Sequence, residues 1–200
     1  MSDLQPIFQS IFNADWQNLP PVMHKHYANR PYSDDVVTVS GKMDVEFGWL
    51  VRLMSPLLRV FGALVPYQGN NIPVTVHFRS RHDSNLYCLD RTFNFPNKEP
   101  YVFFSKLTPI NIDIVVELMK YGIGWKHRFY WNGEKVILEH RGYVWKLSGM
   151  TVPVPLGLIL GKGYAEEEAI DDNNFRMKMN ITHSVFGKMY EYRGFFAIVQ

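Results

Sequence analysis

Residues 175–199 read FRMKMNITHSVFGKMYEYRGFFAIV, and this stretch decides the fold class. In its first half, large apolar side chains alternate with polar ones: Phe175, Met177, Met179 and Ile181 stand against Arg176, Lys178, Asn180 and Thr182. A period of two predicts a strand with one face in a core and the other in solvent. The segment HSVFGK predicts a turn, and MYEYRGFFAIV predicts a further strand.

The same pattern recurs upstream, with turn signals at short spacing. Strand-like runs occupy residues 36–47, 73–81, 86–95, 101–107, 110–122, 129–136, 135–147 and 163–170, although DIVVELMKY within 110–122 also reads as a helix. We therefore predict one domain over residues 1–200, α+β but mainly antiparallel β. Its curved sheet or barrel-like grip has about ten strands, and a helix-grip or lipocalin-like cavity is the nearest analogy.

Helical patterns flank this sheet. Ser2 or Asp3 can cap a helix with an apolar stripe of Leu4, Ile7, Phe8 and Ile11, and NLPPVMHKHYANR predicts a second short helix after it. Residues 48–65 predict a helix, kinked near Pro56, around which the sheet would wrap. Arg52 and Arg59 share one face of this otherwise apolar helix. The sequence therefore allows two interpretations: the helix packs inside the curved sheet, or it lies on a membrane surface.

Composition excludes several classes of partner. The net charge of +2, from 21 basic and 19 acidic residues, gives no concentrated basic face for nucleic acid. The longest apolar stretch is interrupted by Arg52, Pro56 and Arg59, so no transmembrane segment is predicted. Cys88 is the one cysteine, which fits a reducing compartment, and we expect a cytoplasmic protein without a signal peptide. No metal or cofactor motif appears, so neither is predicted.

Strand phase selects the candidate site residues. Arg91 shares a face with Tyr87, Leu89, Phe93 and Phe95, where it needs either a structural carboxylate or a bound ligand. His140 lies on one face of residues 135–147, as a core histidine or a functional one, whereas Arg141 and Tyr143 lie on the other with Glu139. In residues 163–170, Glu166 and Glu168 alternate in step with Tyr164 and Ile170, which predicts that they face inward and that Glu167 faces outward. The alternative is a strand whose glutamates are all exposed to solvent.

Six segments together resemble a bacterial family catalogued as a domain of unknown function. They are LPPVMHKHYANRPYSDDVVTVSGKM, VPYQGNNIPVTVHF, DRTFNFPNKEPYVFFS, EHRGYVWKL, VPLGLILGKGYAEEE and FRMKMNITHSVFGKMYEYRGFF, and they span nearly the whole chain. The resemblance implies relatives that occur alone, or fused to saccharopine-dehydrogenase-like reductases or a multispanning membrane protein. It implies no activity and no catalytic residues.

Three functions follow as hypotheses. The first is a binding protein for an apolar or amphipathic, lipid-like small molecule, with a solid core as its alternative; the inward-phased aromatic and methionine side chains motivate it. The candidate ligand-binding residues are Arg91, Phe93, His140, Arg141, Tyr143, Glu166, Glu168, Met177 and Tyr192. The second is an enzyme with Glu166 or Glu168 and His140 or Arg91 as acid–base groups. The third is an interaction domain for a membrane or reductase partner, through the apolar flap at residues 151–160.

Overall fold

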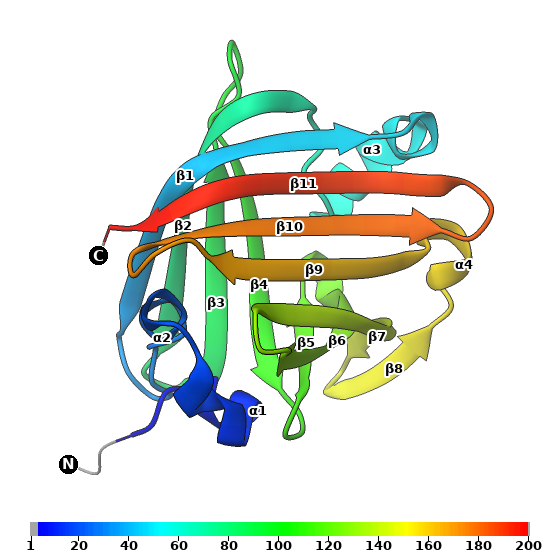
Figure 1. The fold of residues 1–200 in the computed structure, drawn as a ribbon. Helices are drawn as coiled ribbons and strands as arrows, with labels where there is room; N and C mark the ends of the chain where they lie inside the picture. Colours follow the sequence, from blue (N-terminus) through cyan, green and yellow to red (C-terminus); the bar gives the residue numbers. More distant parts are fainter. Residues whose placement is uncertain (1–3, 200) are drawn as a thin grey trace.

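Ten strands form a closed antiparallel barrel in a computed structural model that describes residues 4–199 (Figure 1). The strands run in the order β6-β5-β4-β3-β2-β1-β11-β10-β9-β7, and the β6–β7 pairing closes the ring. An eleventh strand, β8, pairs with β7 outside the barrel. The strands are β1 (Val36–Phe47), β2 (Gly69–Arg81), β3 (Ser84–Phe93), β4 (Tyr101–Pro109), β5 (Ile114–Leu118), β6 (Ile123–Trp131), β7 (Lys135–Leu147), β8 (Met150–Val154), β9 (Lys162–Ala169), β10 (Asn174–His183) and β11 (Gly187–Ile198).

The predicted fold is confirmed: a mainly antiparallel, lipocalin-like barrel of about ten strands with helices at its N-terminus. Segment 110–122, which also reads as helix, contributes the strand β5. The proposed capping residues Ser2 and Asp3 lie outside the described part of the chain. No helix within residues 4–199 has both the length and the apolar character needed to cross a bilayer.

The N-terminal helices cover one end of the barrel. They are α1 (Gln9–Phe12), the 3-10 helix η1 (Asn13–Asn18) and α2 (Pro21–His26). Phe8, just before α1, is fully buried and its ring contacts those of Tyr27, Tyr87 and Phe129, with centroid distances of 4.7, 4.9 and 5.3 Å. The Tyr87 hydroxyl donates to the carbonyl of His26 at 2.8 Å, which fastens α2 to the barrel wall.

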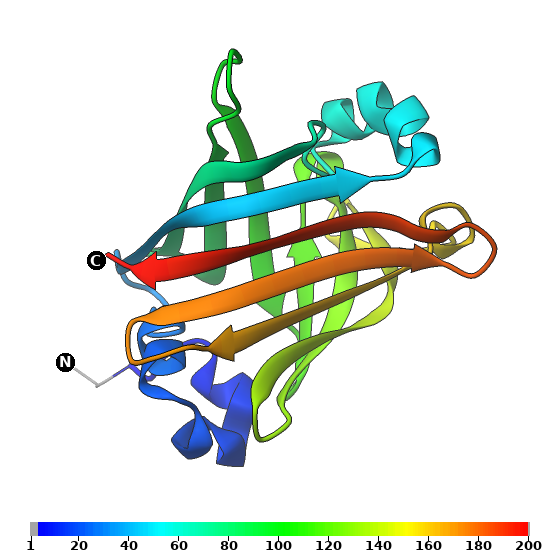
Figure 2. The same ribbon diagram turned by 45° about the horizontal axis from the view of Figure 1, so that its top comes forward.

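The remaining helices lie at the opposite end, as Figures 1 and 2 show. They are α3 (Trp49–Phe61), the 3-10 helix η2 (Lys120–Gly122) and α4 (Gly157–Leu160). Gly62 ends α3 in the left-handed conformation with a φ of 57°, which glycine adopts without steric penalty. Only one side of α3 packs on the barrel, through the buried Val51 and Leu58. The helix therefore lies beside the mouth, and the sheet does not wrap around it as predicted.

The barrel interior is filled by alternate residues of each strand. The six aromatic and methionine side chains predicted to face inward all belong to the core or pack against it: Phe93, Phe95, Met177, Met179, Tyr190 and Tyr192. Polar neighbours such as Arg176 and Lys178 lie on the outer face, as the alternation in residues 174–182 requires. The interior also contains charged groups, and these make up the candidate site.

Candidate functional site

A polar cluster around Arg91 lies inside the barrel. The alternation of β3 directs this arginine inward, and its side chain is 11% exposed. Its guanidinium stacks on the Phe103 ring at 4.1 Å and donates from Nη2 to Glu117 Oε1 at 2.8 Å. The same nitrogen also contacts Ser105 Oγ. The structural carboxylate that burial of Arg91 requires is therefore Glu117, on the adjacent part of the wall.

Glu117 is held by donors on both of its carboxylate oxygens. Besides Arg91, Oε1 accepts from Ser105 Oγ at 2.6 Å, and Oε2 accepts from the Trp125 indole at 2.8 Å. Burial by itself would raise the pKa of Glu117, but the Arg91 guanidinium, helped by the Ser105 hydroxyl, outweighs burial and holds that pKa well below its ordinary value. Glu117 is thus an ionised carboxylate with its acceptors occupied, which makes it a weak base.

The Trp125 indole packs against β9 at Gly163, in the space that a side chain at that position would fill. A Cβ built on Gly163 would lie 1.8 Å from the ring of Trp125, so only glycine fits there. The ring is also close to the His127 imidazole, with centroids 3.8 Å apart. Glycine at position 163 therefore lets β6 present its indole N–H to Glu117.

Two histidines extend the cluster along the facing strands β6 and β7. His127 and His140 are register partners, and the His127 Nε2 lies 3.7 Å from Glu117 Oε2. Burial lowers the pKa of His127, and burial with the neighbouring His127 lowers the pKa of His140 to about 4. Both imidazoles are neutral near pH 7 for that reason. Both nitrogens of His127 and the Nδ1 of His140 are buried without a hydrogen-bond partner.

A bulge in β7 changes which residues face inward. Gly142 has a φ of 117°, and the β6–β7 register shifts at this position. As a result Tyr143 is buried, lies with its ring 4.7 Å from that of His140, and donates to the carbonyl of Gly161 at 3.1 Å. The expectation that Tyr143 faces away from His140 is therefore wrong. Arg141 does face outward, where it pairs with Glu139 at 2.8 Å.

The phase predicted for β9 is also wrong. Glu167 points inward, where it accepts from the Tyr27 hydroxyl at 2.5 Å and lies 3.5 Å from His26 Nε2. Burial would raise the pKa of Glu167, but His26 and Tyr27 lower it below its ordinary value. The small residues on either side of Glu167 belong to the core after all, because neighbouring elements supply the bulk: Ala165 is buried.

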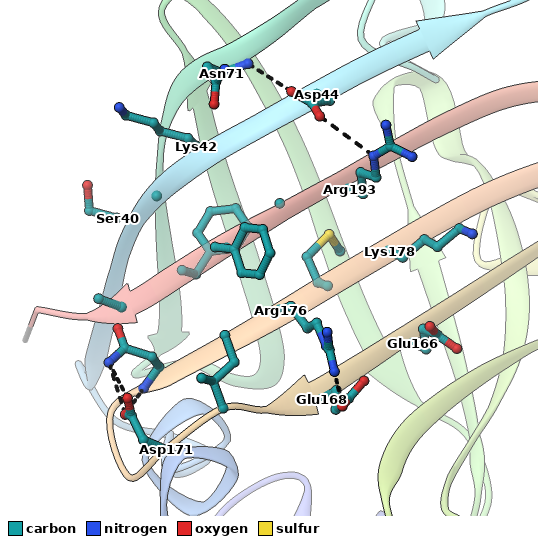
Figure 3. A pocket seen from close by; sticks show the side chains of 18 of the residues that line it. Ser40, Lys42, Asp44, Asn71, Glu166, Glu168, Asp171, Arg176, Lys178 and Arg193 are labelled. Carbon is teal, nitrogen blue, oxygen red and sulfur yellow. Dashed lines mark hydrogen bonds and ion pairs between the residues drawn. The ribbon is translucent and has the colours of Figure 1, made fainter.

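Glu166 and Glu168 lie instead on the outer face, in a broad hollow of about 890 Å³ across β1, β11, β10 and β9 (Figure 3). Arg176 reaches Glu168, and Lys135 lies 3.4 Å from Glu166 and 3.1 Å from Glu168. Figure 3 also shows Arg193 reaching Asp44, at 3.6 Å. Most of the carboxylates in this hollow thus pair with a neighbouring cation, and solvent-exposed pairs of this kind contribute little to stability.

Two small cavities lie inside the barrel, and Arg91 and Tyr192 line both of them. The cavity toward α2 has about 60 Å³ and includes Phe93, Met177 and Glu167 in its lining. The cavity toward the mouth has about 50 Å³ and is lined by Glu117, Trp125 and mostly apolar side chains. Either volume holds a few waters, whereas pockets for drug-sized ligands run to roughly 300 Å³ and more.

The apolar flap at residues 151–160 contributes the lid of the second cavity. Leu156 and Leu160 line the cavity, whereas Leu158 is 80% exposed and Ile159 is 51% exposed. Val152 and Pro153 on β8 are exposed as well. The flap therefore serves two purposes at once: it closes the barrel mouth and presents apolar side chains to the surroundings.

The candidate residues divide into an inner and an outer group. Arg91, Phe93, His140, Tyr143, Met177 and Tyr192 face the interior, whereas Arg141, Glu166 and Glu168 do not. The acid–base arrangement in which His140 or Arg91 meets Glu166 or Glu168 in one cavity is therefore absent from residues 4–199. No group of three or more His, Cys, Asp or Glu side chains in this range could hold a metal ion.

Sequence reasoning missed Glu117, Trp125, His127 and Ser105. In β5 both Val115 and Val116 are buried, so alternation gives no signal that Glu117 faces inward. The sequence did indicate that a buried Arg91 needs a carboxylate partner. It did not indicate which of the acidic residues is that partner, because their distances along the chain do not show which one lies nearby in the fold.

A family model described as Domain of unknown function (DUF4166) matches residues 19–196, and the chain belongs to that family. No curated protein matches the chain. Among solved structures, the crystal structure of Rv2717c from M. tuberculosis is similar, with a TM-score of 0.50 and 11% identity over 99% of this chain and 100% of that one. This likeness shows a shared barrel fold and nothing more. The dehydratase domain of the polyketide PpsC from Mycobacterium tuberculosis matches with a TM-score of 0.20 at 6% identity over 94% and 84% of the two chains, too low to support an argument.

Proposed function

Starting from membership in a family of unknown function, we propose that the chain binds an apolar or amphipathic, lipid-like small molecule inside the barrel. One observation carries the proposal: a cavity beneath α4 is lined mostly by apolar side chains and ends on Arg91 and Glu117. Apolar walls with a few convergent polar groups are the usual composition of small-molecule sites.

In this proposal the polar end of the ligand contacts the Arg91–Glu117 ion pair, which has no net charge. Arg91 uses Nε and Nη2 in its contacts with Phe103, Ser105 and Glu117, and its guanidinium also interacts with the Tyr192 hydroxyl on the same cavity wall. Because Glu117 balances the charge of Arg91, a fully ionised head group gains little there. A hydroxyl, ester or carbonyl oxygen, which accepts a hydrogen bond without bringing a charge, suits the site better.

Binding requires the lid to move. A volume of about 50 Å³ cannot hold an acyl chain, so the ligand must displace Leu156 and Leu160 from the mouth. The lid is fastened by few polar contacts, among them the Tyr143 hydroxyl on the Gly161 carbonyl and a ring nitrogen of His183 near the Leu158 carbonyl, each at 3.1 Å. A four-residue helix held in this way is a reasonable gate.

The test is a thermal-shift panel of long-chain alcohols, monoacylglycerols and fatty acids, with native mass spectrometry of the purified protein. A ligand at about a hundredfold excess over its Kd stabilises the folded state by about 2.7 kcal/mol, which raises Tm by several degrees. Leu160→Trp fills the mouth and removes this shift. Val102→Trp, at a 56% exposed position on β4, keeps it.

The proposal fails if no compound in the panel raises Tm and no small molecule co-purifies. It also fails if Leu160→Trp, with an unliganded Tm like that of the wild type, retains the full shift. A greater shift with the ionised fatty acids than with the neutral lipids would overturn the assignment of a neutral polar end.

A further inference from the structure

An apolar rim surrounds the mouth of the barrel. We define it by six side chains that are each at least 67% exposed: Trp49 and Leu53 on α3, Tyr121 on η2, Met150 on β8, Leu158 on α4 and Val185 in the β10–β11 turn. They come from five separate segments of the chain. Large apolar side chains scattered singly over a surface need no explanation, but a set gathered at one end of a barrel does.

Contacts between the segments make the rim continuous. The N-terminal part of α3 meets the β10–β11 turn, where the rings of Trp49 and Phe186 lie 6.4 Å apart. The C-terminal part of α3 meets η2, where the rings of Phe61 and Tyr121 lie 5.9 Å apart. The helix thus lies along the edge of the mouth, in contact with both of these neighbours (Figure 2).

The other half of the rim is joined in the same way. The Trp145 indole on β7 donates to the Tyr121 carbonyl at 2.9 Å, which links η2 to the β7–β8 hairpin. The chain continues from β8 into α4, and the Leu158 carbonyl lies 3.1 Å from a ring nitrogen of His183 at the end of β10. These contacts join the exposed apolar groups into one rim at the mouth, of which Leu158 on the lid is a part.

The charged side chains in the segments that form the rim are all basic. The segments that build it, residues 48–66, 119–124, 142–163 and 182–190, contain none of the 19 acidic residues of the chain. Six exposed basic residues lie within them: Arg52, Arg59, Lys120, Lys146, Lys162 and Lys188. Within residues 4–199, Lys188 is the one of these six that pairs with carboxylates, those of Glu46 and Glu191 on the barrel wall, both at 3.4 Å.

We propose that this rim docks on the surface of an anionic lipid bilayer. Apolar side chains that enter the acyl boundary, together with lysines and arginines at head-group level, are the combination by which peripheral proteins bind such surfaces. A second copy of the chain is disfavoured, because a symmetric contact would bring the two basic rims together. The inference goes beyond the proposed ligand binding and holds whether or not the interior takes a ligand.

Vesicle co-sedimentation tests the proposal with the full chain. We expect binding to vesicles of equal parts phosphatidylcholine and phosphatidylglycerol, weakened by salt, and little binding to phosphatidylcholine alone. Leu53→Ser combined with Leu158→Ser weakens binding roughly tenfold or more, because two exposed apolar anchors are lost. The matched control is Val102→Ser combined with Ile112→Ser, at positions that are 56% and 69% exposed elsewhere on the barrel.

Charge is tested separately. Lys120→Glu weakens binding to the anionic vesicles, whereas Lys42→Glu on the outer wall does not. All these positions are exposed, so the variants fold. Absence of binding to either vesicle, equal binding to both, or equal binding by the two serine variants overturns the proposal. A concentration-dependent dimer that Leu53→Ser with Leu158→Ser abolishes also overturns it, because the rim is then a self-association surface.

Discussion

The buried pair of Arg91 and Glu117 gives the sharpest test of the interior. Replacement of Arg91 by Met keeps an unbranched, flexible side chain but removes the guanidinium, which leaves the Glu117 carboxylate without its cation. Their side chains are only 11% and 10% exposed, and breaking such a pair costs about 3–5 kcal/mol. Since Ser105 and Trp125 still donate to the carboxylate, we expect about 3 kcal/mol, in the lower part of that range.

Urea denaturation followed by tryptophan fluorescence measures this loss. With a slope of about 2 kcal/mol per molar urea, the midpoint falls by about 1.5 M. The matched control is Arg79→Met, which removes the 3.0 Å pair with Asp90, where the side chains are 45% and 31% exposed. That exposed pair contributes less than about 1 kcal/mol. The double variant Arg91→Met with Glu117→Gln recovers part of the loss, because no charge is then left buried.

The loss also depends on pH. In the wild type the folded-state pKa of Glu117 is below its ordinary value, so its ionisation contributes stability above pH ~4.3 that is lost as the pH falls. In Arg91→Met, burial without the cation raises the pKa of Glu117. Protonation of Glu117 at low pH then removes the buried unpaired charge and restores part of the lost stability. The difference in unfolding free energy between wild type and variant therefore narrows from about pH 7 to about pH 4.5. A difference that is constant with pH, or no larger than that of Arg79→Met, refutes the reasoning.

Two further predictions concern the same cluster. Gly163→Ala forces the Trp125 ring away from a Cβ that would lie 1.8 Å from it, which destabilises the fold by about 1–3 kcal/mol and shifts the tryptophan emission. The control Gly157→Ala, with its nearest neighbour 3.9 Å away, leaves both unchanged, and an equal effect of the two variants would contradict the packing argument. For His140, whose pKa of about 4 lies below the ordinary value near 6.5, stability is full above pH ~6.5 and falls as the pH drops toward 4, because the unfolded chain binds the proton first. His140→Leu makes the free energy of unfolding less dependent on pH in this range. An NMR titration that gives the His140 ring an ordinary pKa would contradict this prediction.

Local pattern determined the wall of the barrel. The period of two in residues 175–199 and in the runs before it sufficed to predict about ten strands and to direct Arg91, Phe93, Met177 and Tyr192 inward. This works because alternation is a property of each strand by itself, and a strand with one buried face must show it. The need of Arg91 for a partner followed from the same pattern, through the free energy of burying a charge.

Tertiary structure decided what the interior contains. Glu117 meets Arg91 only because β3, β4 and β5 lie side by side, a placement that 26 residues of separation do not encode. The bulge at Gly142 turned Tyr143 inward, and the bulk of Trp125 and Tyr27 allowed the small residues of β9 to face the core, so that Glu167 entered and Glu166 and Glu168 did not. Whether the barrel is hollow also depends on how side chains from ten strands fill one space. No single strand carries that information, because packing is a property of the closed barrel.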